Sequence, residues 1–454
     1  MQGHLDGAEE IYMIPAYPLM YFYPHWQDWK KEYRDEWNWN RIINVFCEKH
    51  ASVIDSRRIP GFNGMQNLGK SKNEYVAVDE QLFRLTLSHL LANEPIKSST
   101  FLLAVHYAYS ICRGEDITKK HLLIYHIHAH DYLSYLLADF PNLIIVAMTR
   151  DPRSNLQRRI ETCYNVDAGK LNKSDTYIFR ALPVYNTIRY ILQDNQIIAS
   201  TVAADRIRIV RHEDLGLRLE DTLRSLCVWL GLKYSADMLD ITFGEKEWWG
   251  DAVYNMAKTN RFNPRVLSKD WQLSKSTIEW YIEEGLMLDF FVKYGYVVEK
   301  YKTDSFPSRI FIVLLSIIPS KNEVGLLLFF LNPKNILSFI LASWQEATGS
   351  LPIKDYTWNA TYLYKWMYFE LRLWETRLHV QVMTKLKYYA LHSNIKLFKN
   401  MLNIGAISLY VLGQCVRYVF AIIKLPYWYL RTRKVMAQRM IERWRGKALL
   451  PESL

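Results

Sequence analysis

The sequence predicts an α/β fold in which helices flank a parallel sheet, followed by a mainly α-helical, basic region. Short apolar runs typical of strands alternate with helical patterns over residues 1–304. The run LIIVAMT at 143–149 lacks polar alternation, which is typical of a strand covered on both faces of a parallel sheet. Residues 305–454 carry 20 Lys/Arg against 7 Asp/Glu, whereas the first 304 residues carry 37 against 39. The net positive charge of the chain is therefore confined to the last third.

Four apolar runs are the predicted strands, and each is followed by a turn signal and a helical pattern. They are Phe101–Ala108, Leu122–Ile127, Leu143–Thr149 and Arg206–Arg211. The stretch Leu219–Leu230 has the 3.6-residue period of an amphipathic helix. This alternation predicts helices packed on both faces of the sheet.

A polar segment with a proline, Asp304–Ser308, is the predicted domain boundary, because the charge balance changes there. It divides the chain into an α/β domain at 1–304 and a helical, aromatic-rich region at 305–454. The second region begins with three short apolar bursts, each too short to span a bilayer. These bursts are Ile310–Ile318, Val324–Leu331 and Ile336–Trp344, and a helical region from Tyr356 to Arg445 follows them.

Composition excludes several classes of protein. Half of the residues are hydrophobic and 23% are charged, which excludes an intrinsically disordered chain. The five cysteines are scattered and contain no Cys-x-x-Cys pair, so neither a disulfide framework nor a cysteine zinc site is indicated. We expect no cleavable secretory signal, since the first 30 residues lack an apolar core.

The first candidate site is the segment Thr149–Ser154, directly after a predicted strand. Ligands of open α/β sheets bind beyond the carboxyl ends of strands. The planar guanidinium of Arg150 suits a phosphate group, and the first amides of the next helix attract anions. A surface turn with solvated arginines is the alternative.

The second candidate site, Val210–Leu215, begins at the end of a predicted strand and precedes the helix at 219–230. Glu213 and Asp214 are suited to cap that helix by accepting from backbone amides. The third site is Trp248–Asp251, with Arg261 downstream. Its paired tryptophans beside a glycine suit a cover over a nucleotide base, although core tryptophans are commoner.

Together these segments resemble the sulfotransferases that use 3′-phosphoadenosine 5′-phosphosulfate (PAPS). The similarity lies in Arg150–Arg153, His212–Leu215, Leu230-Gly231-Leu232, Trp271, Leu273 and Gly295-Tyr296, in the family's order over roughly residues 5–300. The resemblance implies a fold with the topology of P-loop nucleotide hydrolases and PAPS as the sulfuryl donor. It also implies that Arg150 and Arg158 hold the 3′-phosphate, and that the other nucleotide contacts are His212, Trp249, Gly250 and Arg261.

Three departures from the family pattern change these expectations. The family's first strand and its loop for the 5′-phosphosulfate have no counterpart, and the similarity begins at His4–Gly7, in the last turn of the next helix. We expect either a chain cut short at its start or a degenerate, non-catalytic descendant, which leaves the activity of residues 1–454 open. In addition, Arg158 stands where the family usually has a serine, and His212 where it has a tyrosine.

A histidine cluster, His126-Ile127-His128-Ala129-His130-Asp131, ends the strand predicted at 122–127. Period-two geometry would point the three imidazoles to one face. The resemblance implies a general base that deprotonates an acceptor hydroxyl. His128 fits the spacing of one family branch and His130 that of another, so both remain candidates. A metal site is the weaker alternative, because later ligands are lacking, and we predict none.

The carboxy-terminal third predicts binding to an anionic membrane surface. No carboxylate occurs from Thr376 to Ile441, where eleven Lys/Arg are interleaved with Tyr and Trp. Basic amphipathic helices with interfacial aromatics bind such surfaces, at about 1 kcal/mol per basic residue. The longest apolar stretch, Leu402–Ile423, contains Arg417, so we predict that it lies in the interface. A solvated helical bundle is the alternative, and no motif supports nucleic-acid binding.

The sequence therefore predicts a PAPS-dependent sulfotransferase that acts on a hydroxyl of a glycan or lipid-linked acceptor. It is expected at the cytoplasmic face of a membrane, as a peripheral or monotopic protein. One alternative is a non-catalytic membrane-associated scaffold that retains the fold. Another is a metal-dependent hydrolase that uses His126, His128 and His130.

Overall fold

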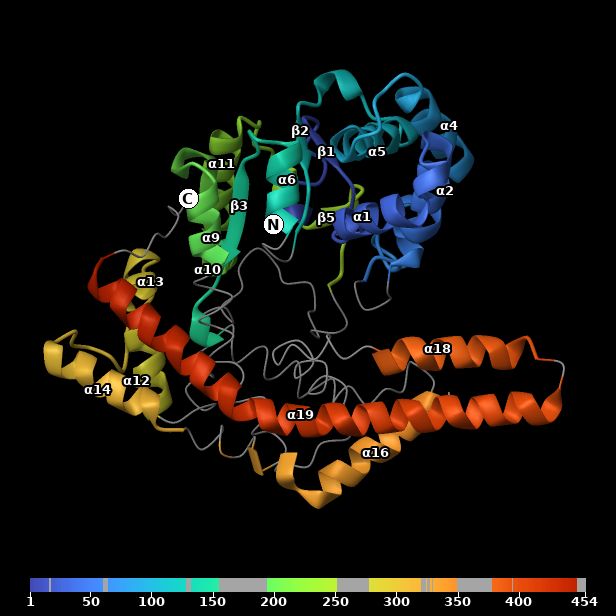
Figure 1. Cartoon of the computed structure of the whole chain (residues 1–454). Helices are drawn as coiled ribbons and strands as arrows, with labels where there is room; N and C mark the ends of the chain where they lie inside the picture. Colours follow the sequence, from blue (N-terminus) through green and yellow to red (C-terminus); the bar gives the residue numbers. More distant parts are fainter. Residues whose placement is uncertain are drawn as a thin grey trace. The chain divides into compact units, whose positions relative to one another are not determined.

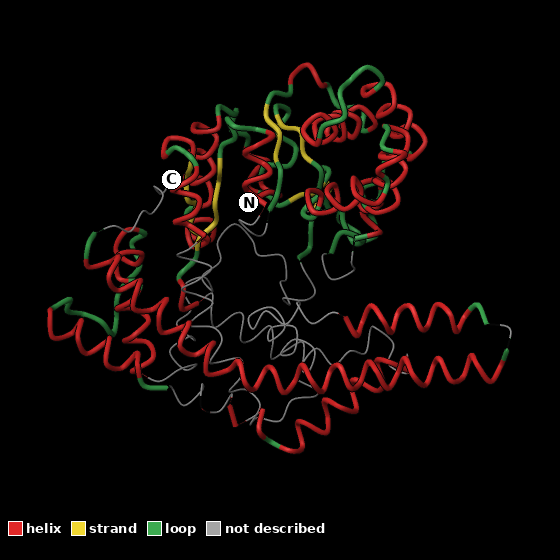
Figure 2. The backbone as a smooth tube through the Cα atoms, in the orientation of Figure 1, coloured by secondary structure: helices red, strands yellow, loops and turns green. Residues whose placement is uncertain are grey.

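A computed structural model of the whole chain shows two compact units (Figures 1 and 2). Unit 1 comprises residues 1–150, 193–268 and 449–454, and unit 2 comprises residues 151–192 and 269–448. The predicted division at residue 304 remains a prediction. The residues that the structure describes are 1–15, 18–59, 64–127, 132–154, 194–250, 277–319, 324, 327–328, 330–348, 378–393 and 395–446.

The described strands of unit 1 form three two-stranded sheets. In the first, β1 (Ile11–Met13) pairs in parallel with β2 (Leu122–Ile124). In the second, β3 (Ile145–Thr149) pairs in parallel with β4 (Ile207–Arg211). The third is an antiparallel hairpin of β5 (Thr242–Phe243) and β6 (Lys246–Glu247). Three of the four predicted strands are therefore present. With the helices around them, they confirm the predicted α/β fold class.

Helices surround these strands (Figure 1). They are α1 (Phe22–Glu32), α2 (Trp39–Lys49), α3 (Ala51–Ile54), α4 (Glu80–Leu91), α5 (Ser98–Cys112), α6 (Leu133–Asp139), α9 (Asp194–Thr201), α10 (His212–Leu217) and α11 (Leu219–Leu230). Asp79 caps α4 by accepting from the amide of Leu82. Helix α11 has the predicted bounds and ends at Gly231, whose φ of 70° suits a glycine.

One predicted strand, Phe101–Ala108, is wrong, because it lies inside helix α5. Its buried residues Phe101, Leu102 and Val105 recur at helical spacing, and the ring of Phe101 packs edge-on against Phe46 of α2. A short apolar run does not distinguish a strand from a buried helix. Here 15 consecutive residues form the helix, which packs against α4 and buries one face in the core.

Two buried clusters hold unit 1 together. The larger is centred on Phe22, Phe46 and Phe101 and joins helices α1, α2 and α5. The smaller joins both parallel pairs to one helix, and includes Ile11 of β1, Leu122 and Ile124 of β2, Val146 of β3, and Leu223 and Leu226 of α11. The two pairs therefore share a core, although β2 and β3 are not hydrogen-bonded to each other in the described strands.

The expectation that the strand at 143–149 is covered on both faces is wrong for the described part of the molecule. Ile145, Val146 and Ala147 are half-buried, and Met148 is 44% exposed. The partner strand differs, because Ile207, Ile209 and Val210 of β4 are buried. The reason for the error is that a short apolar run fits a half-covered strand as well as one covered on both faces, so composition alone does not determine coverage.

Unit 2 is helical in its described residues. Its helices are α12 (Thr277–Leu286), α13 (Leu288–Lys293), α14 (Phe306–Ile317), α16 (Pro333–Thr348), α18 (Leu378–Leu391) and α19 (Lys396–Trp444). Helix α19 packs against α12, α14, α16 and α18. Near its end, Arg439 pairs with Asp289 of α13 and Arg443 with Asp304. The predicted helical character of the carboxy-terminal region is confirmed for these residues.

Helix α19 is the longest element among the described residues. Its 49 residues correspond to about 73 Å of helix, well beyond the roughly 30 Å hydrocarbon core of a bilayer. By length and composition it is the one described helix that could cross a membrane, and 28% of its most apolar window is buried. This finding is weak support for membrane association, and it leaves open whether the helix crosses a bilayer or lies in its interface.

Candidate functional site

The predicted anion site lies at the carboxyl ends of β3 and β4. These strands are parallel, and Thr149 is the register partner of Arg211. The next residue of each strand, Arg150 and His212, therefore follows at the same edge of the sheet. The structure thus brings together two residues that are separated by 62 positions in the sequence. This is the edge at which open α/β sheets bind ligands.

Arg150 and His212 influence each other electrostatically. Burial is the main cause that lowers the pKa of His212 to about 4, and the positive charge of Arg150 lowers it further. His212 is therefore neutral at pH 7. Its Nδ1 atom is buried and has no hydrogen-bond partner among the described residues. A neutral imidazole beside a guanidinium suits an anionic ligand that accepts from Arg150.

The second arginine of the motif, Arg153, is a structural residue of unit 2. It is 3% exposed, and its guanidinium donates to Asp151 at 2.7 Å and to Glu284 at 2.6 Å. Glu284 is fully buried and also accepts from the backbone amides of Lys300 and Tyr301. Arg153 therefore forms an internal ion pair. The motif by itself suggests instead that an arginine binds an anionic ligand.

The expected capping of the helix at 219–230 by Glu213 and Asp214 is wrong. Both residues lie in the first turn of α10, which begins directly after β4, and Arg218 stands at the N-cap of α11 with no side-chain cap. Asp214 instead pairs with Arg218 at 2.9 Å. The short helix α10 lies between β4 and α11, and Glu213 and Asp214 belong to its first turn.

Trp249 is held by a loop around Gly69, which lies 180 residues earlier in the chain. Its indole N–H donates to the carbonyl of Gly69 at 2.6 Å, and the Lys72 ammonium lies 4.4 Å from the ring centroid. Gly250 has a φ of 103°, and a Cβ atom on Gly64 would collide with its carbonyl. These contacts join Trp249 to the loop around Gly69.

The same loop carries a signal that was not among the predicted sites. Gly64–Ser71 fits the Gly-x₄-Gly-Lys-Ser spacing of phosphate-binding loops, which requires a strand before the loop and a helix after it. Here Leu68 and Glu74 exchange two backbone hydrogen bonds, and the Gly69 amide donates to Glu247 at 2.8 Å. The described part of this segment is therefore a hairpin turn, and its spacing is a false match.

Four predicted site residues lie outside the described residues, namely His128, His130, Arg158 and Arg261. His126 is described and follows β2. The described residues contain no group of three potential metal ligands. Because two histidines of the cluster are not described, the metal prediction remains untested.

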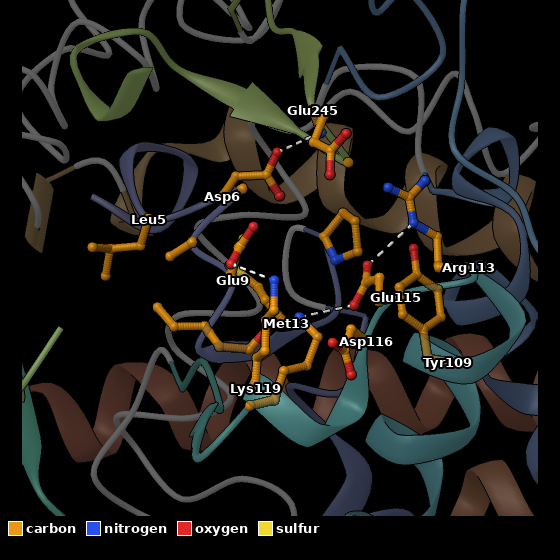
Figure 3. A pocket seen from close by; sticks show the side chains of 16 residues that line it. Leu5, Asp6, Glu9, Met13, Tyr109, Arg113, Glu115, Asp116, Lys119 and Glu245 are labelled. Carbon is orange, nitrogen blue, oxygen red and sulfur yellow. Dashed lines mark hydrogen bonds and ion pairs between the residues drawn. The ribbon is translucent and has the colours of Figure 1, made fainter. Parts of the chain in front are cut away.

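A cavity of about 200 Å³ lies beside the first parallel pair (Figure 3). It is lined by the segments that lead into β1 and β2 and by the turn of the β5–β6 hairpin. Its charged groups pair with one another: Glu115 with Arg113 at 3.4 Å and with Lys120 at 3.0 Å, and Glu9 with Lys119 at 3.0 Å. It contains none of the predicted site residues.

Comparison with known proteins supports the predicted family. Residues 48–236 match the sulfotransferase family. The matched range includes Arg150 and His212 but neither Trp249 nor Arg261. No curated protein and no solved structure matches the chain. The resemblance to sulfotransferases is therefore confirmed over residues 48–236.

Proposed function

Because residues 48–236 carry a sulfotransferase-family domain, we propose that this chain transfers a sulfuryl group from PAPS to a hydroxyl of a glycan or lipid-linked acceptor. The observation that carries the proposal is the meeting of Arg150 and His212 at the carboxyl edge of β3 and β4. A cation at the ligand-binding edge of a parallel pair suits a nucleotide phosphate.

The described residues fit part of a PAPS site. Arg150 would hold the 3′-phosphate through its charged fork, and His212 would lie beside it as a neutral imidazole. Arg158, Trp249, Gly250 and Arg261 remain proposed nucleotide contacts. PAPS would supply the activated sulfuryl group, and the family resemblance implies a histidine base, for which His128 and His130 are the candidates in the sequence.

The nucleotide selectivity of the chain tests this proposal. Adenosine 3′,5′-bisphosphate is expected to bind about 10- to 100-fold more tightly than adenosine 5′-monophosphate, since a charge-assisted contact contributes about 1.5–3 kcal/mol. Isothermal titration calorimetry measures both affinities. Equal affinities would contradict a site for the 3′-phosphate, and a chain that binds neither nucleotide would favour the non-catalytic scaffold.

We also propose that residues 305–454 hold the protein on an anionic membrane surface, at the cytoplasmic face. On α19, Leu412, Val419 and Ile423 recur on one side of the helix and are each more than half exposed. On α14, Phe306 and Leu314 are exposed as well. Exposed apolar residues on helices next to a basic segment fit a surface that inserts shallowly into lipid. A membrane position would favour a lipid-linked acceptor.

Vesicle flotation tests the membrane proposal. The full chain should float with vesicles that contain phosphatidylserine, and binding should weaken at high salt without vanishing, because salt screens charges but not apolar contacts. The double substitution Leu412→Ser and Val419→Ser should remove most of the salt-resistant binding. Leu85→Ser, at a similarly exposed position of α4, is the control and should leave vesicle binding unchanged.

Two outcomes would contradict this view of residues 305–454. If the chain fails to float at low salt, the region is a solvated bundle. If protease cleaves on both sides of the bilayer and only detergent extracts the chain, α19 spans the membrane.

A further inference from the structure

Two histidines outside the predicted site lie close together near the first parallel pair. His25 is in the first turns of α1, and His50 follows the end of α2. His25 Nδ1 lies 3.2 Å from His50 Nε2, and His50 Nδ1 lies 2.9 Å from the carbonyl oxygen of Pro18. Both separations fit hydrogen bonds that link a loop, α2 and α1 in series.

The Pro18 carbonyl fixes the protonation of both rings. A carbonyl only accepts, so His50 Nδ1 carries the proton that is donated to Pro18. Burial lowers the pKa of His50 to about 4, so the ring is neutral and its Nε2 is an acceptor. His25 Nδ1 must then donate to it. The proton-free nitrogen of a neutral His25 is therefore Nε2.

Burial, rather than the surrounding charges, keeps His25 neutral at pH 7. Burial lowers its pKa, Asp28 on the same helix opposes the shift, and Lys49 of α2 adds to it. The ring stacks on Trp29, with centroids 5.9 Å apart. His25 is half-buried, and no described residue donates a hydrogen bond to its Nε2. This nitrogen is thus a basic group with a fixed orientation.

The position of His25 is at the ligand-binding edge of unit 1. The loop after β1 is tied to the segment after β2, because the Tyr125 hydroxyl donates to the Leu19 carbonyl at 2.7 Å. The ring of Tyr21 meets that of Tyr132, at the end of the histidine-cluster loop. His25 follows β1 and Arg150 follows β3, so each lies beyond the carboxyl end of a parallel strand, where α/β sheets bind ligands.

We propose that His25 is a catalytic base of the transfer reaction and that His50 is its positioning residue. This inference rests on the proposed sulfotransferase function. His25 Nε2 takes the proton of the acceptor hydroxyl as that oxygen bonds to the sulfur of the phosphosulfate donor. The bond between sulfur and the bridging phosphate oxygen breaks, and the nucleotide leaves with the electron pair.

Chemical modification tests the state of His25 without any substrate. Diethyl pyrocarbonate acylates accessible neutral imidazole nitrogens, and peptide mass spectrometry of the full chain locates the product. His25 should react, with half-maximal reactivity below a pH of about 6.5, while buried His50 should not. An unreactive His25, or a His50 that reacts first, would contradict the assigned relay.

Sulfation kinetics test the catalytic role. His25→Gln should lower kcat about 100-fold or more with little change in KM for PAPS. His50→Phe, which keeps a ring but removes the acceptor, should lower kcat at least about tenfold, and His50→Gln should recover part of it. His89→Gln, an exposed position on α4, is the control and should behave as the wild type.

Imidazole rescue separates a base from a structural residue. Added imidazole should restore part of the activity of His25→Ala and none of that of Arg150→Ala. Normal activity of His25→Gln would overturn the proposal and leave the proposed function intact. The proposal would also be overturned if only substitution of His128 or His130 abolished activity and added imidazole restored the activity of those variants. A wild type that binds adenosine 3′,5′-bisphosphate but sulfates no acceptor would contradict the proposed function and this role with it.

Discussion

Replacing Arg150 with alanine is expected to weaken the binding of adenosine 3′,5′-bisphosphate by about 10- to 100-fold. The reason is that a charge-assisted contact to a phosphate contributes about 1.5–3 kcal/mol. Arg150→Lys should recover only part of the affinity, because an ammonium cannot form two parallel hydrogen bonds. Isothermal titration calorimetry on both variants and the wild type measures the difference.

A second measurement shows whether the two residues act as a pair. Removing the Arg150 charge should raise the pKa of His212 from its value of about 4, although burial will still hold it below normal. Histidine signals in an NMR titration, assigned with His212→Gln, report this shift. Unchanged affinity in both Arg150 variants would remove this arginine from the site.

The largest expected effect on stability comes from Glu284. Glu284→Ala should lower the free energy of unfolding by about 3–5 kcal/mol, because the buried Arg153 then keeps only Asp151 of its two carboxylate partners. It also removes the acceptor of the Lys300 and Tyr301 amides. Urea denaturation followed by circular dichroism measures the loss.

The control is an ion pair of the same residue types on the surface. Glu220 and Arg224 lie 2.7 Å apart on α11 and are each about half exposed. Glu220→Ala should cost no more than about 0.5 kcal/mol, since solvent screens exposed pairs. Equal losses in the two variants would show that burial does not set the value of the Arg153–Glu284 pair.

Much of the fold was predictable from local patterns. Strand β4 and helix α11 lie almost where the sequence placed them, because each has a clear period and clear end signals. The failure at α5 has a different cause. Phe101–Ala108 is apolar enough for either structure, and the choice depends on the helices around it.

The candidate site was predictable only in part. The position of Arg150 after a strand indicated an anion site, and the meeting with His212 confirms that the two segments share one edge. The role of Arg153 was not visible in the motif, because its partner Glu284 lies 131 residues away. The His25–His50 pair was missed because single histidines in separate helices form no sequence motif.

The sequence by itself determined the elements whose signals are local: the α/β class, the family resemblance, and the basic, apolar character of the last third. These depend on period, composition and order along the chain. Only the tertiary structure decided which charged groups are buried and which face a ligand edge. Within the motif Arg150–Arg153, Arg153 is buried in an ion pair, whereas Arg150 lies beside the neutral His212. Burial and long-range pairing set the pKa and the partner of each group, and neither is encoded in the spacing of neighbouring residues.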